Sequence, residues 1–180
     1  MVTSIKGNDT STFGGAVNLG SNNLTTTGNA DVGQVITDAP AFRAYTGANQ
    51  SVSPATATKV NFDTEEFDTN SCYDTTNKRF TPTIEGYYQI NASAYWLTAF
   101  ADQKQTWISI YKNGSSIGYG SVQNSSGTND GLSPSISQLV YMNGSTDYLE
   151  IYIRQGDSVS RTVYGSSTFA WFTGHLVRAV

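Results

Sequence analysis

The sequence predicts an all-β fold, a sandwich or jelly roll of short antiparallel strands that follows a polar N-terminal arm. From Ala39 onward, apolar and polar side chains alternate over short stretches, which is the pattern of strands with one buried face. Asn-Gly dipeptides at two positions each separate a pair of these stretches, and no window shows the period of an amphipathic helix. Many short strands separated by such turns are typical of sandwiches and jelly rolls.

The N-terminal arm, residues 1–38, contains no Trp or Tyr and is dominated by Gly, Asn, Ser and Thr. Its candidate anchor residues are Val17, Leu19 and Leu24, which stand among turn-forming residues. One copy of such a segment buries too little apolar surface to fold alone. We interpret it as an anchoring or oligomerisation arm that orders on a larger body or on copies of itself. The alternative is a flexible leader ahead of a head domain at residues 39–180.

The clearest strand signal runs from Tyr87 to Trp96, where two faces alternate with period two. A predicted core face holds Tyr88, Ile90, Ala92, Ala94 and Trp96, and the opposite face holds Tyr87, Gln89, Asn91, Ser93 and Tyr95.

A hairpin is predicted where Thr106–Tyr111 and Ile117–Val122 flank Asn113-Gly114, because type I′ turns need positive φ at both central positions. Further strands are expected at Leu139–Met142 and Tyr148–Ile153, on either side of the turn Asn143-Gly144, and at the closing segment Thr168–Val177.

The surface composition excludes nucleic acid as the expected partner. Charged residues make up only 13% of the chain, against a typical value of about 25%. The net charge is −4, and the ten basic residues are scattered singly, whereas nucleic-acid binders concentrate Lys and Arg. No stretch approaches the roughly 18 apolar residues of a membrane span, so no membrane insertion is expected.

Cys72 is the only cysteine, so no disulfide within the chain and no thiolate metal site is expected. A lone cysteine is more often a small buried hydrophobe than a reactive thiol. Residues 1–20 lack the apolar run of a signal peptide. We therefore expect the protein to become extracellular by host-cell lysis.

A series of fixed spacings resembles the signature of the complement C1q globular-head family, whose members belong with the tumour necrosis factor-like jelly rolls. Its residues are Phe62, Asp68, Tyr73, Phe80, Gly86 and Tyr88, separated by five, four, six, five and one residues. Ala41–Ala44, Lys112–Gly114 and Phe172–Leu176 resemble the family's opening strand, recurrent turn and last strand. Ile90 and Ala92 stand where the family usually carries aromatic residues, so the packing there must differ.

This resemblance implies a ten-stranded jelly roll that assembles as a tight homotrimer. The strand face opposite Tyr88 and Ile90 would then turn towards the threefold axis. The trimer-interface candidates are Gln89, Asn91 and Tyr95, together with Phe172 from the last strand. The alternative is that these side chains are solvated or lie in the monomer core.

Catalysis is not predicted. His175 is the only histidine, and no nucleophile elbow precedes a helix, so a Ser-His-Asp triad has no support. The only acidic cluster, Asp63 to Asp68, spans a strand end and a loop, where paired carboxylates for glycoside hydrolysis are not expected. A solvated loop is the favoured interpretation, with calcium as the open alternative. No other cofactor is expected.

Three functions remain open at this point. The arm resembles the short Gly/Asn/Thr-rich segments of bacteriophage appendage and capsid-surface proteins, which favours a virion structural protein held by its arm to other virion proteins. On the virion surface it would serve as a capsid decoration (cement) protein or a short spike or fibre tip. The second function is host-cell adhesion by a tail-fibre module that recognises glycans through a loop such as Gln123–Leu132. The third is a secreted C1q-like ligand for a protein receptor.

Overall fold

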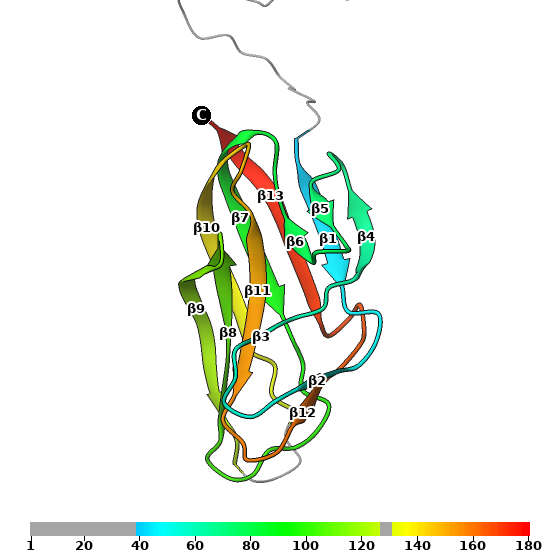
Figure 1. Ribbon diagram of the computed structural model, residues 1–180, viewed down its shortest axis with the longest axis vertical. Helices are drawn as coiled ribbons and strands as arrows, with labels where there is room; N and C mark the ends of the chain where they lie inside the picture. Colours follow the sequence, from blue (N-terminus) through cyan, green and yellow to red (C-terminus); the bar gives the residue numbers. More distant parts are fainter. Residues whose placement is uncertain (1–38, 127–130) are drawn as a thin grey trace, which may run out of the picture. The chain divides into compact units, whose positions relative to one another are not determined.

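The computed structural model describes residues 39–126 and 131–180, which form a two-layered β-sandwich (Figure 1). The predicted all-β fold is confirmed for these residues, because none of them lies in a helix. Consequently, the described residues contain no helix long and apolar enough to cross a membrane. The anchor candidates Val17, Leu19 and Leu24 lie outside the described residues.

The first sheet contains five antiparallel strands, and its outer face forms the first candidate site below. In spatial order these strands are β10 (Ser135–Asn143), β7 (Glu85–Ser93), β13 (Trp171–Ala179), β1 (Ala41–Tyr45) and β4 (Thr64–Asp68).

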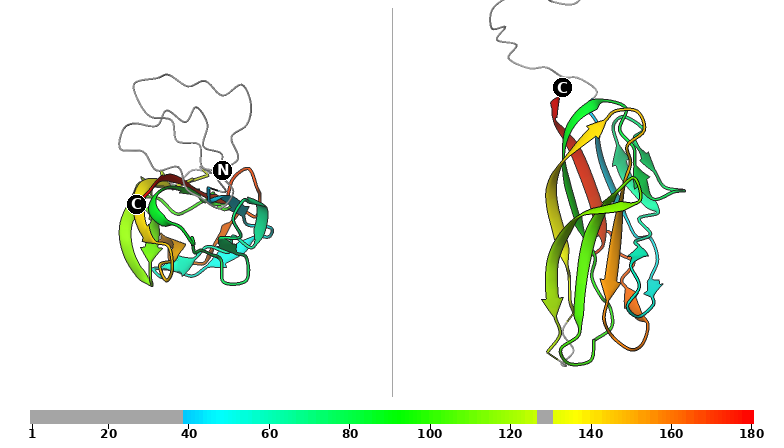
Figure 2. Two further views of the ribbon diagram at one scale, coloured as in Figure 1. Left: turned by 90° about the horizontal axis from the view of Figure 1, so that it is seen from above. Right: turned by 60° about the vertical axis from the view of Figure 1, so that its left-hand side comes forward.

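The second sheet faces the first, as the end and side views of Figure 2 show. Its strands in spatial order are β5 (Tyr73–Asp74), β6 (Arg79–Phe80), β11 (Leu149–Gln155), β8 (Gln105–Lys112) and β9 (Ser115–Asn124), and β3 (Thr58–Lys59) pairs with β11. A small separate sheet pairs β2 (Gln50–Val52) with β12 (Arg161–Val163). The described residues therefore contain thirteen strands rather than the expected ten. Eleven lie in the two layers, including the short β3, and the small sheet adds β2 and β12.

The alternation predicted from Tyr87 to Trp96 is confirmed by burial. All five predicted core residues on this segment are fully buried, although β7 ends at Ser93 and Trp96 joins Val163 only through an isolated bridge. Because the parity of β7 is fixed by these side chains, Gln89 and Asn91 necessarily turn to the outer face of the sheet.

The predicted hairpin at Asn113-Gly114 is also confirmed. Asn113 has a φ of 52° and Gly114 a φ of 80°, so both central residues adopt the left-handed conformation that a two-residue turn between β8 and β9 requires. The second Asn-Gly, at residues 143 and 144, joins β10 to β11, which lie in different sheets. There the Asn143 side-chain oxygen accepts three backbone N–H groups, from Ser145, Thr146 and Asp147, and this closes the connection.

The core compensates for the small residues on β7. Ala92 lies opposite Phe172 of β13, and Gly174 lies opposite Phe42 of β1. The rings of Phe42 and Phe172 meet edge-on with centroids 4.8 Å apart. Aromatic side chains from the neighbouring strands therefore fill the space that Ala92 leaves empty, which explains how the core closes without an aromatic at that position.

The start of β1 and the C-terminus lie at the same end of the sandwich (Figure 1). The Leu176 N–H donates to the Pro40 carbonyl at 2.9 Å, and the Val180 N–H donates to Glu85 at 3.2 Å. The β7–β8 connection lies at the opposite end. The sandwich thus has one end that carries its chain termini and one end formed by loops.

Candidate functional site

The first candidate site is the outer face of β10, β7, β13 and β1, because the second sheet covers only the inner face. Gln89 on β7 lies opposite Leu139 on β10 and His175 on β13, and Asn91 lies opposite Ser137 on β10. The Gln89 amide donates to the Asn91 side-chain oxygen at 3.3 Å and to the Ser137 hydroxyl at 3.0 Å. A polar amide row therefore crosses the centre of an open sheet face.

An apolar region lies next to this row. Leu139 is 53% exposed, and the rings of Tyr87 and Tyr141 lie 5.7 Å apart between centroids. The Tyr141 hydroxyl donates to the Glu85 carboxylate, and this hydrogen bond raises the pKa of Tyr141 above its ordinary value. The two tyrosines and Leu139 together form an exposed patch of large side chains on the outer face of this sheet.

A hollow of about 470 Å³ lies further along the same face. It is lined by Arg43, Asn91, Ala92, Ser135, Ile136, Ser137, Trp171 and Thr173. The Arg43 guanidinium donates to Glu66 and to the Ser167 carbonyl, each at 2.7 Å, and lies 5.6 Å from the Trp171 ring. Sequence analysis did not single out Arg43 or Trp171, since their meeting depends on the pairing of β1 with β13.

Three of the four interface candidates are at least partly exposed. Gln89 and Asn91 lie on the outer face, and Asn91 lines the hollow. Tyr95 lies just beyond β7, where its ring packs 5.1 Å from that of Phe169 and 6.4 Å from that of Tyr164. Their role in contacts between subunits stays a prediction.

The structure contradicts the prediction that Phe172 lies at the subunit interface. Its exposed fraction is 0%, and its ring packs on Phe42 in the core of the single chain. Phe172 pairs with Ala92, a residue of the buried face of β7, so both side chains point between the sheets. The outward residues of β13 are instead Trp171, Thr173 and His175, and Phe172 cannot contact another subunit.

The residues of the spacing pattern organise the core beneath this sheet. Phe80 stacks on Phe42 at 4.6 Å and meets Tyr88 edge-on at 5.3 Å. The Tyr73 hydroxyl donates to the Phe62 carbonyl at 2.7 Å. Burial raises the pKa of the Tyr88 hydroxyl to about 12.

Asp68 has a different role, because its carboxylate closes the loop before β5. It accepts the Tyr73 N–H at 2.7 Å, the Asn70 N–H at 3.1 Å and the Cys72 thiol at 3.2 Å. Burial and then Asp68 raise the pKa of that thiol well above its ordinary value. Cys72 is therefore an inert buried side chain rather than a nucleophile.

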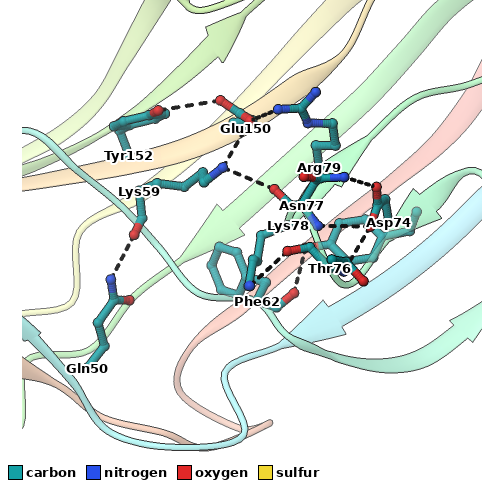
Figure 3. A network of polar contacts seen from close by, with 11 residues as sticks. Gln50, Lys59, Phe62, Asp74, Thr76, Asn77, Lys78, Arg79, Glu150 and Tyr152 are labelled. Atoms are coloured by element: carbon teal, nitrogen blue, oxygen red, sulfur yellow. Dashed lines mark hydrogen bonds and ion pairs between the residues drawn. The ribbon is translucent and has the colours of Figure 1, made fainter.

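A polar network on the outer face of the second sheet holds the β5–β6 hairpin in place (Figure 3). Glu150 is only 3% exposed, and one of its carboxylate oxygens accepts Lys59 Nζ at 3.1 Å and Arg79 Nη2 at 2.9 Å. The Arg79 guanidinium also lies 4.1 Å from the centroid of the Tyr148 ring. These contacts connect β3, β6 and β11 through a single buried carboxylate, and this explains the burial of Glu150 by a structural role.

The geometry around His175 gives no support to a catalytic triad. In the sheet its neighbours are Ala41 and Gln89, which supply neither a nucleophile nor a carboxylate. Within the described residues, Glu150 contacts Lys59, Arg79 and the Tyr152 hydroxyl, and these contacts give no support to the paired carboxylates of a glycosidase.

The acidic segment is divided among separate contacts. Glu66 pairs with Arg43, Asp63 accepts the Gly47 N–H at 2.9 Å, and Asp68 closes its own loop. Within residues 39–126 and 131–180, no three His, Cys, Asp or Glu side chains converge in a group that could hold a metal ion. Calcium binding by this protein stays a prediction.

Comparison with known proteins gives a family match over most of this sandwich. Residues 41–177 match the profile of the C1q domain. A search of curated protein sequences finds no significant match.

Several solved structures are similar to the sandwich. The globular domain of zebrafish complement 1qA has a TM-score of 0.56 at 17% identity, covering 79% of this chain and 99% of that one. Eiger TNF from S. frugiperda has a TM-score of 0.55 at 13% identity, covering 79% and 93%. Murine APRIL has a TM-score of 0.57 at 9% identity, covering 77% and 99%. At these identities the similarity establishes the jelly-roll fold.

Proposed function

The chain belongs to the C1q domain family, and from this premise we propose that it is a non-enzymatic, homotrimeric head protein of a bacteriophage virion surface. The outer face of β10, β7, β13 and β1 forms the contact between subunits. The arm of residues 1–38 attaches the trimer to other virion proteins, most simply as a capsid decoration protein.

The single observation that carries the trimer is the exposed patch of Tyr87, Leu139 and Tyr141 on this face. Soluble monomers rarely leave large contiguous apolar patches uncovered. The adjoining edge strand β9 exposes Ile117 as well, so one copy has an apolar edge beside an apolar face. If the β9 edge of one copy packs on the face of the next copy, the two copies contribute different surfaces, so the contact is heterologous. Heterologous contacts close into a ring, such as a trimer, when the rotation that relates one copy to the next is that of a closed cyclic symmetry.

Sedimentation of the full chain tests the trimer, and we expect one trimeric species at micromolar concentration. Leu139→Arg places a charge in the patch and should shift the species to monomer. Val159→Arg is the matched control, because Val159 is 52% exposed in the β11–β12 connection, off the outer face of the first sheet. A monomeric wild type, or equal effects of the two substitutions, would rule out this interface.

The virion assignment is supported by the uncharged polar composition and by the position of the chain ends in the head. The Pro40 carbonyl accepts a hydrogen bond from the Leu176 N–H at the end of the sandwich that carries the C-terminus. The loop end is therefore free to project from a trimer that is anchored at the other end.

Deletion of residues 1–38 tests the anchor. The truncated chain should remain a folded trimer and should no longer bind to virions that lack the wild-type protein, whereas the full chain should restore decoration. If the truncated head still decorated the particles, the head itself would make the contact and the anchoring role of the arm would be refuted.

A further inference from the structure

The outer face of the second sheet carries a group of side chains that the subunit interface does not use. Trp107 on β8 lies opposite Val122 on β9 and Arg154 on β11. Two residues before Trp107, Gln105 lies opposite Asn124. The residues that alternate with Gln105 and Trp107 on β8 are buried in the core, so these five side chains all project from the same outer surface.

A hollow of about 250 Å³ lies within this group, lined by Gln105, Trp107, Tyr119 and Val122; we term it the Trp107 hollow. Tyr119 is 67% exposed and Val122 is also exposed. No aromatic ring of the described residues packs against Trp107 or Tyr119. Two large aromatic surfaces are thus available at one small concavity, which is below the usual size of sites for drug-sized ligands.

The indole of Trp107 is held in position from one side. The Arg154 guanidinium lies 4.6 Å from the centroid of the Trp107 ring, and Arg154 Nε donates to the Ala55 carbonyl at 2.9 Å. Because Arg154 is itself tethered to the backbone, it restrains the ring on which it stacks. A restrained aromatic surface loses little conformational entropy when a ligand binds.

Polar groups at the hollow are free for a ligand. Within the described residues, the side-chain amides of Gln105 and Asn124 make no hydrogen bond to the protein. Gln123 differs, because its amide donates to the Ser133 carbonyl at 3.2 Å and accepts the Ser133 N–H at 2.7 Å. Gln123 and Asn124, the first two residues of the predicted loop Gln123–Leu132, therefore belong to β9, and of the two only Gln123 is used by the fold; residues 127–130 of that loop lie outside the described residues.

We propose that the Trp107 hollow binds a neutral pyranose ring of a glycan. The C–H face of a pyranose packs against flat aromatic rings, and its hydroxyls both donate to and accept from planar amides such as that of Gln105. None of the four lining residues is charged, and the neighbouring Arg154 stacks on Trp107 and donates to the Ala55 carbonyl rather than lining the hollow, which favours a neutral ligand. The size of the hollow suits one ring of a longer chain.

The location suits this ligand and does not depend on the trimer. Gln105 begins β8 and Asn124 ends β9, so the hollow lies toward the loop end of the sandwich, away from the C-terminus (Figure 1). All four lining residues come from one chain, and their strands β8 and β9 belong to the second sheet, whereas Tyr87, Leu139 and Tyr141 lie on the first. The site would therefore be present in a monomer as well.

Calorimetric titration of the full chain with maltohexaose, cellohexaose and chitohexaose, each alone, tests the proposal. We expect at least one to bind with a Kd of about 1 mM or lower, measured up to about 10 mM ligand. Tyr119→Ala should weaken that binding at least about tenfold, and Gln105→Ala should weaken it several-fold. Trp107→Phe keeps a smaller ring and should bind with intermediate affinity.

Phe169→Ala is the matched control, since Phe169 is an exposed aromatic in the β12–β13 connection and does not line the hollow; its binding should equal that of the wild type. Absence of heat with all three sugars would overturn the proposal. So would binding that Tyr119→Ala and Gln105→Ala leave unchanged. If Tyr119→Ala instead dissociated the trimer and left sugar binding intact, the hollow would be an interface between copies and the proposal would be wrong.

Discussion

Gly86 at the start of β7 lies directly against the backbone of Arg178 on β13. A side chain at residue 86 would collide with the Arg178 carbonyl oxygen and would lie 2.8 Å from the Leu176 side chain. The pairing of β7 with β13 shifts register between Leu176 and Arg178, so the backbone of β13 is irregular at this point. The glycine permits this close approach of two strands at the end of the sheet.

Gly86→Ala is therefore expected to destabilise the fold. The obstacle is backbone rather than the end of a flexible side chain, so relief requires the strands to separate, at a cost of about 1–3 kcal/mol in the free energy of unfolding. Gly156→Ala is the control, because a methyl group there would meet nothing closer than 3.4 Å, and its effect should stay within about 0.5 kcal/mol. Urea unfolding measures both, and equal effects would contradict the close approach.

Tyr88 and Gln89 are neighbours in sequence with opposite surroundings. Tyr88 is fully buried, its ring contacts Phe80, and its hydroxyl donates to the Ile84 carbonyl at 2.7 Å. Tyr88→Ala should cost about 3–5 kcal/mol, a large part of a usual domain stability of roughly 5–15 kcal/mol. Gln89→Ala should change the stability of the subunit little.

Thermal melting at several protein concentrations separates the two effects. Tyr88→Ala should lower the Tm at every concentration, whereas Gln89→Ala should alter mainly its concentration dependence, because Gln89 lies on the proposed subunit interface. The opposite pattern, an unfolded Gln89→Ala beside a tolerated Tyr88→Ala, would mean that the inward and outward faces of β7 are exchanged.

The buried face of β7 could be predicted from the sequence because apolar and polar side chains alternate clearly along it. The buried position of Phe172 could not, because β13 shows no such clear alternation. Around Phe172, both Trp171 and Phe172 are large and apolar, and Gly174 carries no side chain to mark a face. The parity of β13 depends on its pairing with Ala92 of β7, which is a contact far away in the chain. Patterning fixes a face only where both faces carry a signal.

Long-range contacts account for the other residues that sequence analysis did not find. Glu150 alternates with the core residues Leu149 and Ile151 and therefore points outward on β11, yet it is buried because Lys59 and Arg79 arrive from distant segments. Trp107 had an available signal: once Ile108 and Ile110 are assigned to the core, Trp107 must face outward. The hollow beside it also needs Tyr119, and register shifts in the β8–β9 pairing make its position unpredictable from spacing alone.

The carboxylate of Asp157, in the β11–β12 connection, should make the stability of the fold depend on pH in the acid range. Its carboxylate accepts the Ala101 N–H at 3.0 Å and the Ser158 N–H at 2.7 Å, and it pairs with Arg161. Burial alone would raise the pKa of Asp157, but these hydrogen bonds and the guanidinium outweigh it and lower the pKa to about 2. The ordinary value is 3.8, so the folded state favours the ionised form.

A carboxylate whose pKa is lower in the folded than in the unfolded state stabilises the fold at pH values above its unfolded-state pKa. This stabilisation is lost as the pH falls through the folded-state pKa. The contribution of Asp157 is thus complete above about pH 4 and decreases toward pH 2. We expect Asp157→Asn to lower the Tm at pH 7 and to flatten its decline between about pH 4 and 2 relative to wild type. Asp102→Asn, at an exposed carboxylate, is the control and should follow the wild-type curve. A Tm difference between wild type and Asp157→Asn that stayed constant over this range would show that the carboxylate is not preferentially ionised in the folded protein.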